Sequence, residues 1–246
     1  VCNWRRAMKN SYQAQKVIEE VVKERPKARW LFLTLSTKNA IDGETLENSL
    51  KEMTKAFHKL FKYKKVSKNL IGFMRSTEVT VNKNDGSYNQ HMHVLLCVES
   101  AYFRKKENYI TQEEWVDLWQ KALQVDYKPV ANIKAIKPNK KGDKDIQAAI
   151  KETSKYSVKS SDYLTGNHEK DAEIVSDLEQ GLHRKRMLSY GGLLKQKHKI
   201  LNLDDAENGD LIKTSDDETI TDEEEKAHSI TAIWNFEKQN YFLKNM

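Results

Sequence analysis

The sequence predicts an α+β fold of the ferredoxin-like type, an antiparallel sheet with helices on one face. Three observations predict it. Strand and helix patterns follow one another in the order βαββαβ, a short turn joins the two central strands, and the helical segments repeat apolar residues every three or four positions. A further helix and a basic, mostly helical C-terminal extension follow the last strand. The chain of 246 residues can hold one large domain, or a domain with an appendage.

The first elements follow from apolar periodicity and from residues that end helices. Residues 10–24 are expected to form a helix with valine and isoleucine on one face, and Pro26 ends it. The segment WLFLTLS, at 30–36, is short and rich in β-forming residues, which favours a strand. Residues 44–61 place leucine, methionine and phenylalanine at helical intervals, which predicts a second helix.

A hairpin forms the centre of the expected sheet. The apolar runs LIGFMRSTEVTV, at 70–81, and HMHVLLCV, at 91–98, read as two strands. Between them Asp85 and Gly86 form a dipeptide that strongly favours a hairpin turn. The two strands are therefore expected to pair in an antiparallel manner around this turn.

The second helix and strand of the pattern come next. Thr111 and Glu114 have the spacing of a capping box, which predicts a helix that continues to about residue 124. Residues 129–137 read as a strand and residues 145–158 as a helix. Residues 172–200 look mostly helical and strongly basic.

The charge of the chain is divided unevenly along its length. Residues 1–200 hold 38 basic and 24 acidic side chains, whereas residues 201–246 hold 4 basic and 12 acidic ones. A body this basic attracts polyanions, and nucleic acid is the commonest of them; lysines kept for solubility are the alternative. The acidic stretch 201–226 reads as a solvated linker, and SITAIWNFEKQNYFL after it as a small hairpin.

Two cysteines and the absence of a long apolar run bound the cellular setting. Cys2 and Cys97 are far apart and do not suggest a disulfide framework, so a reducing cytoplasm is expected. No segment approaches the roughly 18 uninterrupted apolar residues of a membrane span, so no membrane partner is expected.

Two histidines head the second strand of the hairpin. Side chains alternate across a strand, so His91 and His93 point to the same face, and antiparallel pairing sets Glu78 opposite one of them. Two imidazoles and a carboxylate leave open positions at a divalent cation, as a catalytic ion needs. The donors suit Mn²⁺ at least as well as Mg²⁺. A hydrogen-bonded histidine pair without metal is the alternative.

A tyrosine on the later helix is the candidate nucleophile. On a helix, Tyr156 shares a face with Glu152 and with Lys159, and Lys155 lies close by. A neighbouring ammonium group favours the phenolate form of a tyrosine, whose ordinary pKa is about 10. A surface tyrosine between lysines is the alternative, and Tyr163 is a rival nucleophile without an acidic residue four positions before it.

Several basic and aromatic residues are candidates for DNA contacts. Arginine and lysine side chains hold phosphates, and a tryptophan can stack on a base. Charge clusters of this kind are also common as solvated faces. The candidates are Trp4, Arg5, Arg6, Arg75, Lys155, Arg184, Lys185 and Arg186.

The ordered motifs resemble those of plasmid rolling-circle replication initiators of the Gram-positive type, members of the His-hydrophobic-His endonuclease superfamily. The first motif is FLTLSTKN at 32–39, the second is HMHVLL at 91–96 preceded by GFMRSTEVT at 72–80, and the third is ETSKYSVKSSDY at 152–163. The segment GGLLKQKHKIL, at 191–201, also looks like the C-terminal portion of the family. The resemblance covers nearly all of the basic body.

The resemblance implies roles for the candidate residues. His91, His93 and Glu78 would hold the metal, Tyr156 would be the nickase nucleophile and Glu152 would act in termination. Lys159 would assist at the phosphate. The implied substrate is single-stranded or hairpin DNA of a plasmid double-strand origin, and the implied partners are a host helicase and the replication machinery. A homodimer is compatible with the resemblance.

Two departures from the family pattern accompany this resemblance. Family members often carry a further histidine or a proline just before the pair, where this chain has Tyr88, Asn89 and Gln90. The start VCNWRRAMKN resembles the end of a Cys-rich segment of which only Cys2 remains, so a zinc site there could not form from this sequence alone.

The resemblance and the composition together suggest four regions. Residues 1–28 would be an N-terminal helical segment and residues 29–165 the nickase core. Residues 166–202 would be a basic helical extension, and residues 203–246 an acidic linker with a C-terminal hairpin.

The expected activity is metal-dependent, site-specific nicking and joining of single-stranded DNA through a 5′-phosphotyrosine. Exchanging one phosphodiester for another needs no nucleotide fuel, and the segment GGLLKQK lacks the spacing of a phosphate-binding loop. A single-tyrosine transposase is an alternative within the same chemistry. A non-catalytic nucleic-acid-binding module on a ferredoxin-like sheet is the alternative from another class.

Overall fold

The structure is a computed structural model that describes residues 3–136, 146, 150, 153, 167–202, 232–235 and 240–243. In residues 3–8 and in the last two segments, only the backbone is described. The chain divides into two compact units, Val1–Glu207 and Asn208–Met246.

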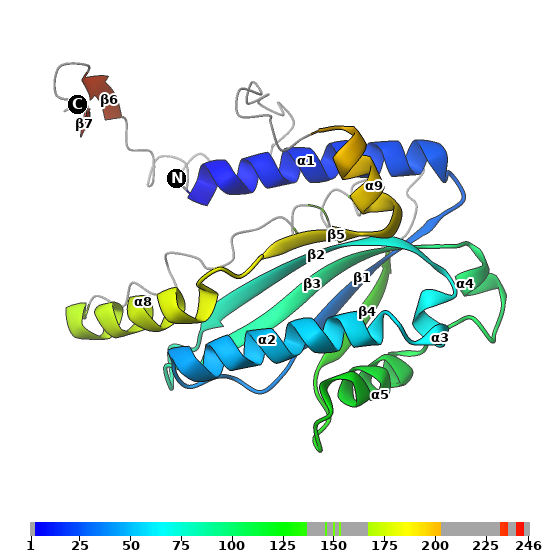
Figure 1. Cartoon of the computed structure of the whole chain (residues 1–246), viewed down its shortest axis with the longest axis horizontal. Coiled ribbons are helices and arrows are strands. Elements are labelled where there is room, and N and C mark those ends of the chain that lie inside the picture. Colours follow the sequence, from blue (N-terminus) through cyan, green and yellow to red (C-terminus); the bar gives the residue numbers. More distant parts are fainter. Residues whose placement is uncertain are drawn as a thin grey trace. The chain divides into compact units, whose positions relative to one another are not determined.

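The first unit is built on a five-stranded antiparallel sheet with strand order β4-β1-β3-β2-β5 (Figure 1). Its first four strands have the order 4-1-3-2 and the chain order βαββαβ, which confirms the ferredoxin-like arrangement expected from the sequence. The strands are β1 Arg29–Ser36, β2 Leu70–Val81, β3 Tyr88–Val98, β4 Ala131–Ile136 and β5 Leu188–Gly191.

The turn between β2 and β3 fixes the register of the central hairpin. Gly86 has a φ of 75°, which an L side chain rarely adopts, and the backbone N–H of Asn82 donates to Ser87 O at 2.8 Å. The strands then pair so that Glu78 lies opposite His91. β3 begins three residues earlier than expected, at Tyr88, because its first residues still pair with β2.

One face of the sheet, called here the α2 face, is covered by α2 Gly43–Leu60 and α5 Gln112–Leu123. Asp42 and Thr111 begin these helices with capping boxes, and the one at Thr111 was predicted. Their apolar stripes pack on alternate residues of β1 and β3. The largest fully buried members of this core are Leu31, Leu33, Leu35, Met53, Phe57, Leu60, Met92, Trp115 and Trp119.

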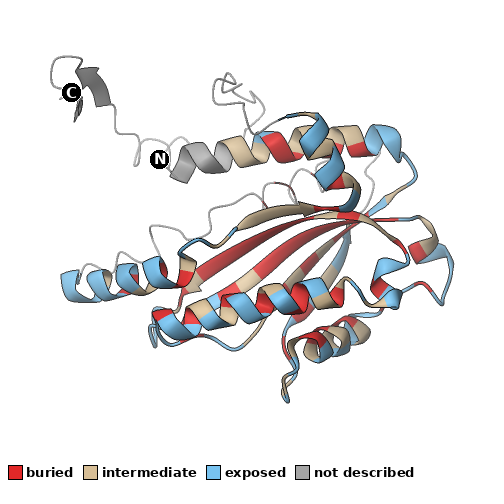
Figure 2. Cartoon of the chain, in the orientation of Figure 1, coloured by how far each residue is buried: buried red, intermediate tan, exposed pale blue. Residues whose placement is uncertain are grey.

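The opposite face, called here the α1 face, is covered by α1 Asn3–Glu24 and α9 Gly192–Ile200. The sequence predicted helices on one face, and the βαββαβ unit has that arrangement. Elements outside this unit cover the second face, because the hairpin strands also have apolar residues there. The buried residues of this core are Ala14, Val17, Ile18, Val21, Trp30, Met74, Leu95, Cys97, Ile146, Ile150 and Leu194. Figure 2 shows the central strands largely buried.

The C-terminal extension contains a strand that the sequence analysis took for part of a helical region. After α8 His168–Leu182, which packs on α2, the chain forms β5 at the edge of β2 and turns at Gly192, whose φ is 58°, into α9. β5 has only four residues and becomes a strand through its pairing with β2, a contact that local sequence does not encode.

Two short helices and the C-terminal hairpin complete the described structure. The helices are α3 Lys64–Ser67 and α4 Ala101–Arg104. The expected hairpin is confirmed as β6 Ala232–Asn235 paired with β7 Asn240–Leu243 in the second unit. Of the helices in the described segments, none combines the length and apolar character that a membrane crossing requires.

Candidate metal centre

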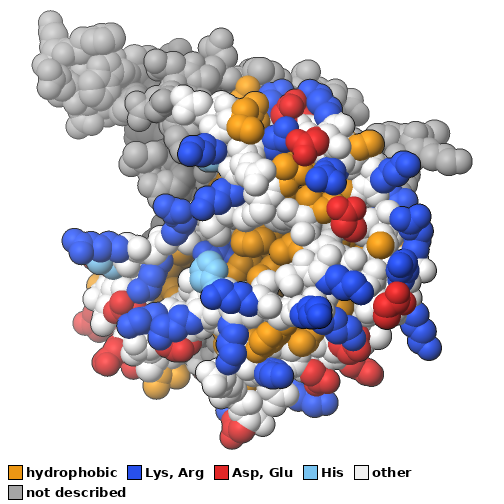
Figure 3. All heavy atoms as spheres, turned by 45° about the vertical axis from the view of Figure 1, so that its right-hand side comes forward, with side chains coloured by type: hydrophobic (Ala, Val, Ile, Leu, Met, Phe, Trp, Pro, Cys, Tyr) orange, Lys and Arg blue, Asp and Glu red, His pale blue; other side chains and the backbone are white. Residues whose placement is uncertain are grey.

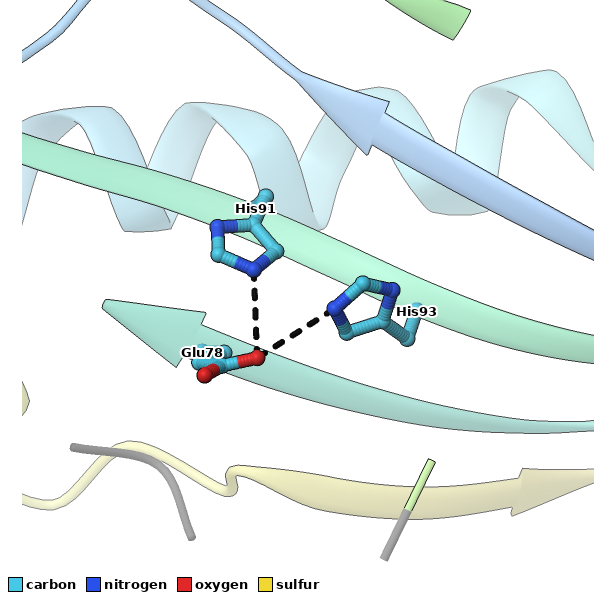
Figure 4. A group of neighbouring side chains, drawn as sticks. All are labelled: Glu78, His91 and His93. Atoms are coloured by element: carbon cyan, nitrogen blue, oxygen red, sulfur yellow. Dashed lines mark hydrogen bonds and ion pairs between the residues drawn. The ribbon is translucent and has the colours of Figure 1, made fainter. Parts of the chain in front are cut away.

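Glu78, His91 and His93 converge on the α1 face, at the middle of the sheet (Figure 4). The carboxylate comes from β2 and both imidazoles from β3, as the hairpin register requires. One carboxylate oxygen, Glu78 Oε2, lies 3.2 Å from Nε2 of His91 and 3.2 Å from Nε2 of His93. The two rings meet edge to face, with centroids 4.7 Å apart.

The three side chains are largely withdrawn from water. The exposed fractions are 7% for Glu78, 15% for His91 and 11% for His93. Burial acts to raise the pKa of Glu78, but the hydrogen bonds and charges of the two histidines outweigh burial and hold that pKa well below its usual range. The carboxylate is therefore ionised at neutral pH and is available as a ligand.

Two residues of β1 support His93 from the side away from Glu78. Thr34 Oγ1 lies 3.2 Å from His93 Nδ1, and the Phe32 ring stacks on the imidazole with centroids 5.4 Å apart. Neither residue was among the predicted site residues. The sequence did contain a signal for them, because Phe32 and Thr34 are two positions apart on β1, share one face of the strand and belong to the first motif.

The donor geometry fits a divalent cation. All three ligand atoms lie within 4.8 Å of one another, and the 3.2 Å separations are close to the roughly 3 Å expected between adjacent ligands at metal–ligand distances of about 2.1 Å. His91 Nδ1 lies 3.4 Å from Asn89 O, a carbonyl that can only accept a hydrogen bond. With a cation bound at Nε2, a proton on Nδ1 would donate to this carbonyl and hold the ring in place.

The other predicted catalytic residues fall outside the described residues. These are Tyr156, Glu152 and Lys159, and the predicted DNA contact Lys155 also lies outside the described residues. Three positions of the same predicted helix are described as helical and buried: Ile146, Ile150 and Thr153. The two isoleucines belong to the core of the α1 face, the face that carries the candidate metal centre.

The predicted DNA contacts do not form one group in the described structure. Arg75 is buried, with 5% of its surface exposed, and it lies on the α2 face because it is three residues from Glu78 on the same strand. Lys185 forms a 2.9 Å ion pair with Glu47. Arg184 and Arg186 are exposed near it, whereas the side chains of the predicted contacts at 4–6 lie outside the described residues.

Basic side chains are nevertheless widespread on the surface. Figure 3 shows lysine and arginine side chains over the face that it presents, with hydrophobic side chains between them. Such a surface attracts a polyanion without specifying a single path across the protein.

Comparison with known proteins identifies the family. A family model described as "Replication protein" matches residues 1–242. The chain is 55% identical over 237 residues to a "Replication protein" of Staphylococcus aureus, covering 96% of this chain and 100% of that protein. It is 53% identical over 244 residues to a "Protein rep" of Lactiplantibacillus plantarum, covering 99% and 77% of the two chains.

A third relative extends the match over the whole chain. The chain is 48% identical over 246 residues to a "Protein rep" of Streptococcus pneumoniae, covering 100% of this chain and 73% of that protein. No solved structure matches significantly. The family expected from the order of the sequence motifs is confirmed: the chain belongs to the replication protein family.

Proposed function

We propose that this replication protein initiates rolling-circle replication of a plasmid by nicking and rejoining single-stranded origin DNA. The observation that supports the proposal most directly is the convergence of Glu78, His91 and His93 on one face of an antiparallel sheet. The basic body of the chain supplies the attraction for a polyanionic substrate.

The triad would hold Mn²⁺ or Mg²⁺ through two imidazole nitrogens and one carboxylate oxygen. When bound, the cation would polarise the scissile phosphate and offset the negative charge that develops there. The chain's own contribution is orientation. β2 and β3 fix the carboxylate and both rings by their register, and Thr34 and Phe32 hold His93 in place.

Tyr156 would be the nucleophile. Its phenolic oxygen forms a bond to the phosphorus, and the bond from phosphorus to the leaving 3′ oxygen breaks. The products are a 5′-phosphotyrosine and a free 3′-hydroxyl, which primes synthesis. The packing of Ile146 and Ile150 on the α1 face supports this assignment, because the predicted helix that contains Tyr156 also contains these residues.

Glu152 and Lys159 would have supporting roles. Lys159 would stabilise the phenolate and the phosphate charge, and Glu152 would accept a proton from water or from an incoming 3′-hydroxyl at termination. Each step exchanges one phosphodiester bond for another, so the strand transfer needs no nucleotide as an energy source. Unwinding and synthesis would be supplied by a host helicase and the replication machinery.

The test uses labelled hairpin oligonucleotides incubated with Mn²⁺ and analysed on a denaturing gel. The expected result is a slower-migrating covalent protein–DNA adduct and a shortened labelled strand. Tyr156→Phe should abolish the adduct, and the matched Tyr163→Phe control should retain it. An unchanged adduct yield from Tyr156→Phe would refute the assignment, and binding without any adduct would favour a non-catalytic module.

The role of Glu152 is tested separately from nicking. Glu152→Ala should form the adduct at close to the normal rate but release less enzyme when a second origin strand is supplied. Mass spectrometry of the adduct identifies the tyrosine that carries the nucleotide. Equal loss of both steps would assign Glu152 to positioning of the nucleophile rather than to termination.

A further inference from the structure

Arg75 is a buried arginine with no acidic partner among the described residues. Its side chain lies on the α2 face of β2, and its exposed fraction is 5%. Nη2 donates to the backbone carbonyl of Arg186 at 3.3 Å, but Nε and Nη1 are buried and make no hydrogen bond in the described structure. A buried charge usually requires a counter-charge, so Nε and Nη1 of this guanidinium are available to donate to an anion.

The charged groups around Arg75 are also positive. Burial lowers the pKa of Arg75, and the positive charge of Arg186 lowers it further. Burial likewise lowers the pKa of His58, with the charges of Arg75 and Lys62 adding to the effect. Basic groups that depress one another's pKa in this way are stabilised together by a bound anion.

The basic side chains near Arg75 differ from it in burial: Arg75, called here the floor, is buried, and His58, Lys62 and Arg186, called here the rim, are exposed. Arg186 acts electrostatically on Arg75, Arg75 and Lys62 each act on His58, and the side chains of His58, Lys62 and Arg186 are exposed. They come from α2, the turn after it and the segment between α8 and β5. Exposed basic side chains from three separate segments therefore accompany one buried guanidinium.

Aromatic rings form the apolar part of the floor. The guanidinium carbon of Arg75 lies 5.2 Å from the centroid of the Phe57 ring. Phe61 and Phe73 each pack within 5.1 Å of Phe57 or of each other, measured between ring centroids. A cation–π contact of this kind contributes far less than the cost of burying an unpaired charge, so the rings do not replace an anion.

We infer that Arg75 and the basic rim formed by His58, Lys62 and Arg186 bind a phosphoryl group. A guanidinium presents paired N–H donors that match phosphate oxygens, and the exposed rim contributes further positive charge. The group would be a phosphate of a DNA strand or a free phosphate, because both present the same oxyanion to these donors.

This site is distinct from the candidate metal centre. Arg75 and Glu78 project from opposite faces of β2, so a phosphate on Arg75 is not the phosphate that the metal centre would act on. The binding itself does not depend on the proposed nicking function. It can therefore be tested without metal and without cleavage.

The first experiment measures the melting temperature of the full chain in EDTA with increasing inorganic phosphate, against sodium chloride of equal ionic strength. A ligand at about 100 times its Kd should raise Tm by roughly 5–10 °C for a protein of this size. Arg75→Leu should lose this specific rise and keep only the general salting effect of phosphate. Lys195→Met, a control on the exposed side of α9, should retain the rise.

The variant also separates an anion site from a purely structural arginine. Without phosphate, Arg75→Leu should melt at the same temperature as the wild type or above it, because an unpaired buried charge has been removed. If Arg75→Leu responds to phosphate as the wild type does, the inference is wrong. If Arg75→Leu does not fold, Arg75→Lys replaces it, and its phosphate response should be reduced.

The second experiment uses the wild-type protein alone. The Nε–H resonance of Arg75, assigned through its own side-chain carbons, is followed by NMR during titrations with inorganic phosphate and with a 12-nucleotide single strand in EDTA. A shift at lower concentrations of the oligonucleotide assigns the site to the DNA strand, and a shift with phosphate alone assigns it to a small phosphate ligand. No shift in either titration overturns the inference.

Discussion

Replacing Thr34 by valine tests whether the hydroxyl behind His93 prepares this histidine to bind a metal. Thr34 Oγ1 lies 3.2 Å from Nδ1 of His93, and Nε2 on the other side of the ring lies 3.2 Å from Glu78 Oε2. Without metal, the carboxylate can only accept, so Nε2 carries the proton and a neutral ring accepts from the Thr34 hydroxyl at Nδ1. With metal, Nε2 must give up that proton and Nδ1 must carry one.

A hydroxyl can serve both states, because it donates in the first and accepts in the second. Valine has nearly the same shape as threonine but can do neither. Loss of such a supporting contact weakens metal binding about 10- to 100-fold, or about 1.4 to 2.8 kcal/mol. We therefore expect Thr34→Val to raise the Kd for Mn²⁺ by this factor, while the fold is retained.

The assay is isothermal titration calorimetry with Mn²⁺ in the absence of DNA, so that nicking does not enter the measurement. Thr34→Ser keeps the hydroxyl and is the matched control, with an expected Kd within about threefold of the wild-type value. A Kd for Thr34→Val within twofold of wild type would refute the role assigned to the hydroxyl.

Three further predictions concern the body of the fold. Gly181→Ala would place a Cβ 2.5 Å from Cδ2 of the fully buried Leu46. Despite a helix-propensity gain of about 1 kcal/mol, this clash should lower the free energy of urea unfolding by about 1 kcal/mol, and equal stability would contradict the prediction. Burial, with a smaller effect of nearby negative charge, raises the pKa of Cys97 to about 12. In a Cys2→Ser background, Cys97 should therefore react with a disulfide reagent only as the protein unfolds, and labelling within seconds in native buffer would contradict this prediction. Burial, followed by a hydrogen bond to the carboxylate of Asp177, raises the pKa of Tyr88, so the contribution of this tyrosine to stability is complete below about pH 10 and falls above it. Tyr88→Phe should therefore reduce the fall of Tm between pH 9 and 11, and an unchanged fall would exclude Tyr88 as its cause.

Local sequence predicted the central hairpin and much of the site because short-range physics determines them. Alternation along a strand places His91 and His93 on one face, and the turn at Asp85 and Gly86 fixes the pairing that brings Glu78 to them. The capping box at Thr111 predicted the start of α5 for the same reason, since its hydrogen bonds lie within one helical turn.

Contacts between distant segments could not be predicted in this way. Thr34 was not recognised as the partner of His93 because the pairing of β1 with β3 joins residues 59 positions apart. β5 was missed because its four residues become a strand only at the edge of β2. Local propensity is weak for so short a segment, and the partner strand decides its conformation.

Arg75 shows most clearly the difference between what local sequence predicts and what contacts between distant segments determine. Strand alternation is enough to predict its face: Arg75 lies three residues from Glu78 on one strand, so it points away from the metal centre. Charge alone placed Arg75 among the predicted DNA contacts. Its burial depends on contacts between distant segments, because the guanidinium lies against the ring of Phe57 and donates to the carbonyl of Arg186, 111 positions later in the chain. Burial depends on which segments pack together in the folded chain, and the pattern of charges along the sequence does not predict those contacts.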